Sequence, residues 1–236
     1  MNAHLKGHLL QFDKPLLAKY EASAGGRLLL TAAGLEVVRL VAATWLRPSI
    51  PLGLFVSVLL AAALLAVPGV AGVTWSQIGF RRWREWTPTE KSYFLQIVVL
   101  ANVVFPLVLA APLGKRIEGA GVAATLSGVF LPYLVFGFYQ EVVYRGMLQL
   151  ELGRRWGTMA GILMANVLYT FGPLHWVYFS SPLKTAGPMF LAIFLIGLFF
   201  GAVYARSGNL WLVTVFHAIG NAYILASLGA ARPGGG

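Results

Sequence analysis

Residues 121–146 read GVAATLSGVFLPYLVFGFYQEVVYRG, and the apolar part of this segment ends at the ionisable residues Glu141 and Arg145. An apolar run of this length is close to the roughly 20 residues that an α-helix needs to cross a bilayer. Ionisable side chains at membrane depth are costly, and they usually face the interior of a bundle and serve a function. The segment therefore predicts a transmembrane helix that carries a buried polar site.

The composition of the whole chain indicates a membrane protein. The 236 residues are 58% hydrophobic and 11% charged, and their mean hydropathy is +0.74. A soluble domain carries about 25% charged residues, so this composition excludes an ordinary soluble protein. The chain has no cysteine, which excludes disulfides and thiolate metal sites.

Apolar segments long enough to cross a membrane recur along the chain. They cover residues 28–46, 50–70, 92–113, 121–150, 157–177, 187–205 and 209–229. We therefore predict an all-α, polytopic transmembrane helical bundle of about seven membrane helices, with a range of about six to eight, around a polar intramembrane cavity. Residues 28–236 form one domain in this prediction, and residues 1–27 form an interfacial or disordered N-terminal segment.

Lysine and arginine are distributed unequally between the two ends of the predicted bundle. With seven crossings, eleven of them lie on the N-terminal side and five on the opposite side. The eleven are Lys6, Lys14, Lys19, Arg27, Arg81, Arg82, Arg84, Lys91, Arg154, Arg155 and Arg206, and the five are Arg47, Lys115, Arg116, Lys184 and Arg232. Because cytoplasmic loops are enriched in Lys and Arg, we expect a cytoplasmic N-terminus. The abundance of Ala, Gly, Leu and Arg fits a bacterium, so the expected location is the bacterial inner membrane.

The net charge of +10 does not predict a nucleic-acid-binding protein. The basic residues are scattered between apolar runs, so they do not form one basic soluble face. In the loop from Thr74 to Lys91, Trp75, Trp83 and Trp86 are mixed with arginines, a combination typical of a segment at headgroup depth. The predicted partner of these side chains is the lipid bilayer, and no nucleic-acid partner is expected.

Glu141 and Arg145 are four residues apart with the glutamate first, which is the favourable order for an ion pair on one helical face. A buried ion pair that holds the bundle together is the simplest interpretation. Gln140 is rotated by about 100° from Glu141 and faces a different neighbour. Because Arg145 engages Glu141, position 140 is the freer one, although an amide cannot take a proton from water.

His175 belongs to a later apolar segment. It follows Gly172 and Pro173, a break that can line a cavity inside a membrane protein. Helix geometry places Glu141 and His175 roughly 18 Å and 27 Å above the turn near Gly153. Because side chains lean towards the N-terminus of their own helix, we expect Glu141 and His175 to converge.

His217 and Asn221 are four residues apart and share a face of the last predicted helix. An imidazole and a carboxamide can donate N–H bonds to an oxyanion where negative charge develops. The alternative is a hydrogen-bonded pair between helices without a chemical role. Together with the two earlier groups, this pair predicts a buried active site.

Three motifs follow in order with helical spacing. They are Gln140-Glu141-x-x-x-Arg145-Gly146, then Phe171-x-x-x-His175, then Tyr204-x-Arg206-x-Gly208-Asn209-Leu210-Trp211 followed by His217-x-x-x-Asn221. With these motifs the chain resembles the CAAX-protease and bacteriocin-processing family, whose members are glutamic-type intramembrane endopeptidases and include the type II CAAX prenyl proteases. The resemblance covers about residues 121–229, and the preceding residues match only in being membrane helices.

The resemblance implies an intramembrane endopeptidase. Such an enzyme hydrolyses a peptide bond near the C-terminal or membrane-adjacent region of a membrane-associated or exported protein substrate. A glutamate and a histidine of the family activate water, so His175 would orient the water and Arg145 would orient Glu141. His217 and Asn221 would form the oxyanion site, and no cofactor is expected.

Position 140 departs from the family pattern. The motif normally begins with two glutamates, and the first is usually credited with the role of base, whereas this chain has Gln140. Glu141 could serve as the base in a natural variant. Alternatively, Gln140 is an engineered Glu→Gln change that inactivates the enzyme, or the chain is a natural non-catalytic relative.

Two other functions use the same residues. A zinc-dependent protease would bind the metal through His175, His217 and Glu141, which is a catalytic type of zinc ligand set, although their spacing forms no compact metal motif. A non-catalytic membrane scaffold or a transporter would use the buried charges for structure or for a substrate path. No paired helices broken by Gly or Pro in matching halves support the transporter.

Overall fold

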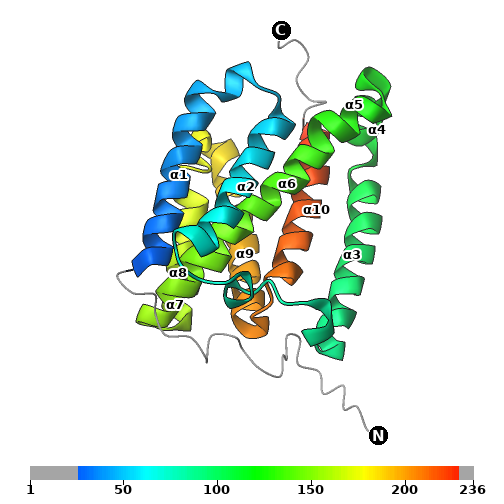
Figure 1. Cartoon of the computed structure of the whole chain (residues 1–236). Helices are drawn as coiled ribbons and strands as arrows, with labels where there is room; N and C mark the ends of the chain where they lie inside the picture. The colour runs from blue at the N-terminus through cyan, green and yellow to red at the C-terminus, as the bar shows by residue number, and fades with distance from the viewer. Residues whose placement is uncertain (1–25, 229–236) are drawn as a thin grey trace, which may run out of the picture.

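The computed structural model describes residues 26–228, so the predicted N-terminal segment 1–27 lies almost entirely outside the described residues. The main helices are α1 (Arg27–Trp45), α2 (Leu52–Gly69), α3 (Pro88–Val108), α4 (Ala110–Ala120), α6 (Leu131–Glu141), α8 (Thr158–Phe171), α9 (Leu183–Ser207) and α10 (Leu210–Leu228). They pack as one bundle (Figure 1). The predicted all-α polytopic bundle is confirmed.

The predicted transmembrane segment that carries Glu141 forms one continuous helix over Val122–Trp156. It runs through α5 (Val122–Thr125), a π-helical stretch (Leu126–Phe130), α6, a second π-helical stretch (Val142–Gln149) and α7 (Leu150–Trp156). π-Helical turns are rare and often occur at functional sites. The second one begins directly after Glu141 and contains Arg145, so the regular helix widens at the predicted polar site.

Six helices of the described chain are long and apolar enough to cross a membrane. The remaining predicted crossing, residues 157–177, contains the shorter apolar helix α8. With 14 residues, α8 spans roughly 21 Å, less than the ~30 Å of a hydrocarbon core. The chain then continues through Gly172 into a short 3₁₀ helix (Trp176–Ser180). α1 begins at one end of the bundle and α10 ends at the other (Figure 1), as an odd number of passes requires.

The third predicted crossing, residues 92–113, has different bounds in the structure. α3 begins at Pro88 because Thr87 and Glu90 form a capping box, with the amide of Glu90 donating to Thr87 Oγ1 at 3.1 Å. The helix ends at Val108, and α4 follows it. Pro112 has no N–H to donate to the carbonyl of Val108, which explains why the first helix cannot continue.

α6 lies between α2 and α10 (Figure 1), and one glycine brings it very close to α10. A Cβ atom at Gly137 would lie 2.6 Å from Ala218 Cα, a distance that no side chain tolerates. Because Gly137 precedes Gln140 by one helical turn and Ala218 follows His217, this contact sets the motif residues of the two helices side by side.

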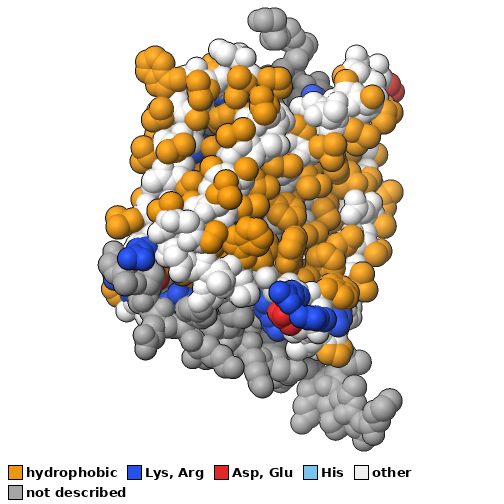
Figure 2. All heavy atoms as spheres, viewed as in Figure 1, with side chains coloured by type: hydrophobic (Ala, Val, Ile, Leu, Met, Phe, Trp, Pro, Cys, Tyr) orange, Lys and Arg blue, Asp and Glu red, His pale blue; other side chains and the backbone are white. Residues whose placement is uncertain are grey.

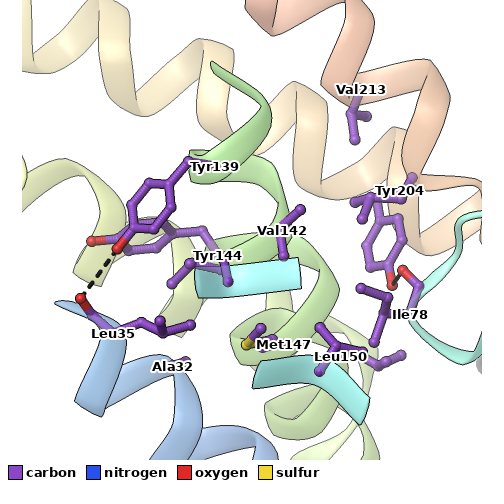
Figure 3. Packing of buried hydrophobic residues seen from close by; sticks show 14 of the residues in the cluster. Ala32, Leu35, Ile78, Tyr139, Val142, Tyr144, Met147, Leu150, Tyr204 and Val213 are labelled. Atoms are coloured by element: carbon purple, nitrogen blue, oxygen red, sulfur yellow. Dashed lines mark hydrogen bonds between the residues drawn. The ribbon is translucent and has the colours of Figure 1, made fainter. Parts of the chain in front are cut away.

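The loop between α2 and α3 packs against the turn between α9 and α10. Tyr204 Oη donates to the carbonyl of Ile78 at 2.8 Å (Figure 3), and the amide of Leu210 donates to the carbonyl of Gly79 at 2.9 Å. Trp75 and Trp83 of the same loop are half exposed. The loop therefore closes one end of the bundle and keeps aromatic rings at its surface.

The outer surface has the pattern of a membrane protein. Orange hydrophobic side chains cover the middle of the visible face, and most of the blue Lys and Arg side chains lie near the end where α1 and α3 begin (Figure 2). Examples of exposed apolar residues are Leu30, Leu65 and Leu107, at 68–73% exposure. These surfaces suit contact with lipid, so the chain is an integral membrane protein.

Candidate active site

The motif residues meet around one cavity of about 610 Å³. Gln140 from α6, His175 from the loop after α8, and His217 and Asn221 from α10 all line it. Most of the other wall is apolar and comes from α3, α9 and α10, with Phe105, Met189, Ile193, Phe200, Phe216 and Leu228 among the lining residues. A few convergent polar groups in an apolar cavity are typical of a ligand or active site.

Glu141 lies behind the cavity wall and is completely buried. Its Oε1 atom accepts a hydrogen bond from His217 Nδ1 at 2.6 Å and lies 3.3 Å from Arg145 Nη1. The predicted ion pair therefore forms, and it is joined to the predicted oxyanion pair through His217. Helix geometry predicted that Glu141 and His175 converge. Of residues 140 and 141, it is Gln140 that lines the cavity together with His175, because successive helical residues point about 100° apart.

Arg145 is held from three sides. Besides Glu141, its Nη2 atom donates to the carbonyl of Gly197 in α9 at 3.1 Å, and its guanidinium carbon lies 4.6 Å from the centre of the Tyr169 ring. The side chain is 2% exposed. An arginine buried to this degree needs such partners, since an uncompensated buried charge is strongly destabilising.

Gln140 is hydrogen-bonded to Asn221, whose Nδ2 atom donates to Gln140 Oε1 at 2.7 Å. An amide nitrogen carries two hydrogens, so Asn221 keeps one for a ligand in the cavity. The same Gln140 oxygen is where a glutamate of the family motif would present a carboxylate. The location of Gln140 on the cavity wall agrees with the expectation that position 140 is freer than position 141.

His175 has a defined tautomer. Its Nδ1 atom lies 2.8 Å from the carbonyl oxygen of Tyr169, and a carbonyl only accepts, so Nδ1 carries the hydrogen. In the neutral ring the lone pair is then on Nε2. A nitrogen in this state can take a proton from water, which the amide of Gln140 cannot do.

Tyr169 is part of the site although no sequence motif predicted it. Its hydroxyl group lies 3.2 Å from His217 Nε2, and its side chain is 6% exposed. In the sequence, nothing distinguishes Tyr169 from other aromatic residues of an apolar helix. The available signal is chemical: a buried tyrosine hydroxyl usually has a hydrogen-bond partner, and a polar group of another helix must supply it.

No group of three His, Asp or Glu side chains within residues 26–228 is placed to hold a metal ion. Glu141, one of the three ligands of the zinc hypothesis, is already engaged by His217 and Arg145. His175 and His217 face the same cavity from different elements.

Residues 122–223 match the model of a protein family described as type II CAAX prenyl endopeptidase Rce1-like. This part of the chain is similar to the CAAX-protease family. The match begins at α5 and ends within α10, so it contains Gln140, Glu141, Arg145, His175, His217 and Asn221. The predicted family resemblance is confirmed.

No curated protein and no solved structure matches the chain. α1 to α4 lie outside the matched residues, yet α3 contributes Phe105 to the cavity and α2 packs against α6.

Proposed function

We propose that the chain is an intramembrane endopeptidase that hydrolyses a peptide bond near the C-terminal or membrane-adjacent region of a protein substrate. The observation that supports this is the meeting of Gln140, His175, His217 and Asn221 on one largely apolar cavity. An apolar wall can hold the hydrophobic part of a substrate, while the polar groups act on its peptide bond. The family of residues 122–223 supports the same reaction class.

In the proposed reaction, a water in the cavity attacks the carbonyl carbon of the substrate. His175 Nε2 takes the proton of the water, because its Nδ1 already carries a hydrogen that is donated to Tyr169. The free N–H of Asn221 donates to the oxygen that becomes negative. The imidazolium of His217, whose two N–H groups are engaged by Glu141 and Tyr169, stabilises that oxygen by its positive charge. The proton on His175 then passes to the leaving nitrogen as the C–N bond breaks.

Glu141 acts in this proposal through His217. The carboxylate stabilises an imidazolium at position 217 and fixes the orientation of its ring, as the short bond of 2.6 Å supports. Arg145 in turn fixes the carboxylate. Glu141 is thus a positioning residue, in contrast to the hypothesis from sequence that it acts as the base on water in a natural variant.

Gln140 limits the rate in this proposal. A glutamate at this position would place a carboxylate on the cavity wall beside Asn221, where it could accept the proton of the water. General-base catalysis contributes about 10²–10⁴-fold. We therefore expect Gln140→Glu to raise the cleavage rate by about 10²-fold or more.

The test uses the full chain in proteoliposomes and a panel of internally quenched peptides with apolar C-terminal ends. Each peptide is offered with and without a prenylated cysteine, so that the panel also decides whether the substrate is lipidated. Cleavage is followed by fluorescence, and the cut bond is identified by mass spectrometry. The chain itself, Gln140→Glu, and Gln140→Glu combined with His175→Ala are compared.

The expected order of rates is highest for Gln140→Glu, lower for the chain itself and lowest for the double variant. Absence of cleavage by Gln140→Glu on every peptide would contradict the proposal and favour the non-catalytic scaffold. Full activity of the double variant would show that His175 does not take part in the mechanism. The zinc alternative predicts stoichiometric zinc in the active protein and loss of cleavage after chelation.

The substrate side follows from the charges at the two ends of the bundle. The cavity extends from His217 and Phe200 towards Met189 at the start of α9 and Leu228 at the end of α10. This end is opposite the arginine-rich loops, which we propose to be cytoplasmic in a bacterial inner membrane. A membrane-associated or exported substrate reaching the cavity from the outer side fits this arrangement.

A further inference from the structure

Tyr169 of α8 contacts three of the charged or titratable residues of the site. Its hydroxyl contacts His217, its main-chain carbonyl contacts His175, and its ring lies under the guanidinium of Arg145. Its ring also meets Tyr144 edge to face at 5.2 Å. No residue of the three motifs makes this set of contacts.

The hydroxyl of Tyr169 meets the second nitrogen of an imidazole whose first nitrogen is already engaged. Because a carboxylate only accepts, the Nδ1 atom of His217 carries a hydrogen that is donated to Glu141. In the neutral ring, Nε2 then accepts from the hydroxyl of Tyr169. In the imidazolium, Nε2 carries a hydrogen and the same hydroxyl accepts it. A hydroxyl group can serve both states without moving, because it is donor and acceptor at once.

The main chain of Tyr169 acts on the other histidine. Its carbonyl oxygen holds the Nδ1 hydrogen of His175 at 2.8 Å and leaves the lone pair on Nε2. The two rings of Tyr169 and His175 are also in contact, edge to face, with centres 5.0 Å apart. One residue therefore connects the histidine that takes a proton with the histidine that faces the oxyanion.

The position of the Tyr169 ring is itself fixed. The guanidinium of Arg145 lies 4.6 Å from the ring centre, within the range of a cation–π interaction. Tyr144 packs edge to face against the Tyr169 ring. A ring clamped in this way places its hydroxyl oxygen without a large entropic cost, and this preorganisation favours catalysis.

We infer that Tyr169 is a positioning residue of the proposed protease site, which keeps His217 hydrogen-bonded at Nε2 in both of its protonation states and fixes the tautomer of His175. The inference rests on the proposed function. The titratable or charged groups that face His217 are Glu141 with its partner Arg145 from the helix Val122–Trp156, Tyr169 from α8, and His175 across the cavity.

Tyr169→Phe tests the inference because it removes only the hydroxyl oxygen. The matched control is Tyr204→Phe, which removes another buried tyrosine hydroxyl, one that donates to the carbonyl of Ile78. Both changes are made in the full chain with ¹⁵N-labelled histidine, and again in the Gln140→Glu background for kinetics.

In Tyr169→Phe we expect the ¹⁵N resonance of His217 Nε2 to shift, while that of His175 Nδ1 stays in place because the carbonyl remains. The cleavage rate should fall about 10-fold at unchanged KM, and the pH–rate profile should move. Tyr204→Phe should change none of these. This pattern separates positioning of His217 from a general loss of stability.

An unchanged His217 spectrum in folded Tyr169→Phe would overturn the inference, whether or not any peptide is cleaved. Failure of the proposed function is seen separately, as absence of cleavage by the Gln140→Glu protein with Tyr169 intact. If Tyr169→Phe does not fold, 3-fluorotyrosine introduced at position 169 keeps the shape and makes the hydroxyl a stronger donor. The His217 Nε2 resonance must then shift, and a resonance that stays in place also overturns the inference.

Discussion

At the scale of single residues, the ion pair between Glu141 and Arg145 can be separated from the chemistry of the site. Glu141→Gln leaves Arg145 as a buried cation without its counter-charge, and we expect the free energy of unfolding to fall by about 3–5 kcal/mol. Adding Arg145→Met removes that charge and should restore most of the stability. Cleavage by the Gln140→Glu protein should be lost in both cases, because His217 has lost its carboxylate.

The measurement is thermal unfolding in detergent, together with cleavage of the peptides, for each single variant and the double variant. Arg145→Met alone completes the cycle. Recovery of activity along with stability in the double variant would show that the pair is purely structural, which was the simplest interpretation of its spacing in the sequence.

The sequence predicted this pair well because both members lie on one helix, where spacing alone determines which side chains meet. It did not predict Tyr169, because the bond to His217 joins residues 48 positions apart. The sequence also predicted that Glu141 converges with His175. Helix rise predicts the height of a residue along the bundle, but the rotation of the helix decides which side chain faces the cavity, and this side chain is Gln140.

At the scale of secondary-structure elements, the contact of α9 with the helix Val122–Trp156 depends on Gly197. A Cβ atom at this position would lie 1.9 Å from Asn166 Oδ1 and 3.2 Å from Arg145 Nη2. We expect Gly197→Ala to push Arg145 away from its ion pair and to lower stability by about 1–3 kcal/mol. The cleavage rate of the Gln140→Glu protein should fall with it.

Gly187→Ala is the matched control on the same helix. A Cβ atom there would meet only Leu183 Cδ1, at 3.9 Å, which is an ordinary contact. Activity should be unchanged, and stability unchanged or slightly higher. If Gly197→Ala behaves like Gly187→Ala in peptide cleavage and thermal unfolding, the close packing of α9 does not position Arg145.

Most of the helices could be predicted, because the length of each apolar segment can be counted in the sequence. The differences have local causes. Pro112 ends α3 early, and α8 is short because the chain leaves the helix at Gly172 before Pro173. The sequence carries no signal of this kind for the π-helical turns at Val142–Gln149.

At the scale of the whole molecule, the unequal charge of the two ends predicts the orientation in the membrane. Among the described residues, Lys and Arg number eight at the end where α1 begins and four at the opposite end. The eight are Arg27, Arg81, Arg82, Arg84, Lys91, Arg154, Arg155 and Arg206, and the four are Arg47, Lys115, Arg116 and Lys184. Loops rich in these residues remain in the cytoplasm.

The absence of cysteine makes this orientation directly measurable, because one introduced thiol is the only reactive one in the chain. Ser76→Cys marks the arginine-rich end and Thr185→Cys the end with the cavity mouth, and both positions are exposed. On intact cells we expect a membrane-impermeant maleimide to label Thr185→Cys, and Ser76→Cys only after permeabilisation. The reverse result would place the cavity mouth on the cytoplasmic side, and the substrate would then be a cytoplasmic protein.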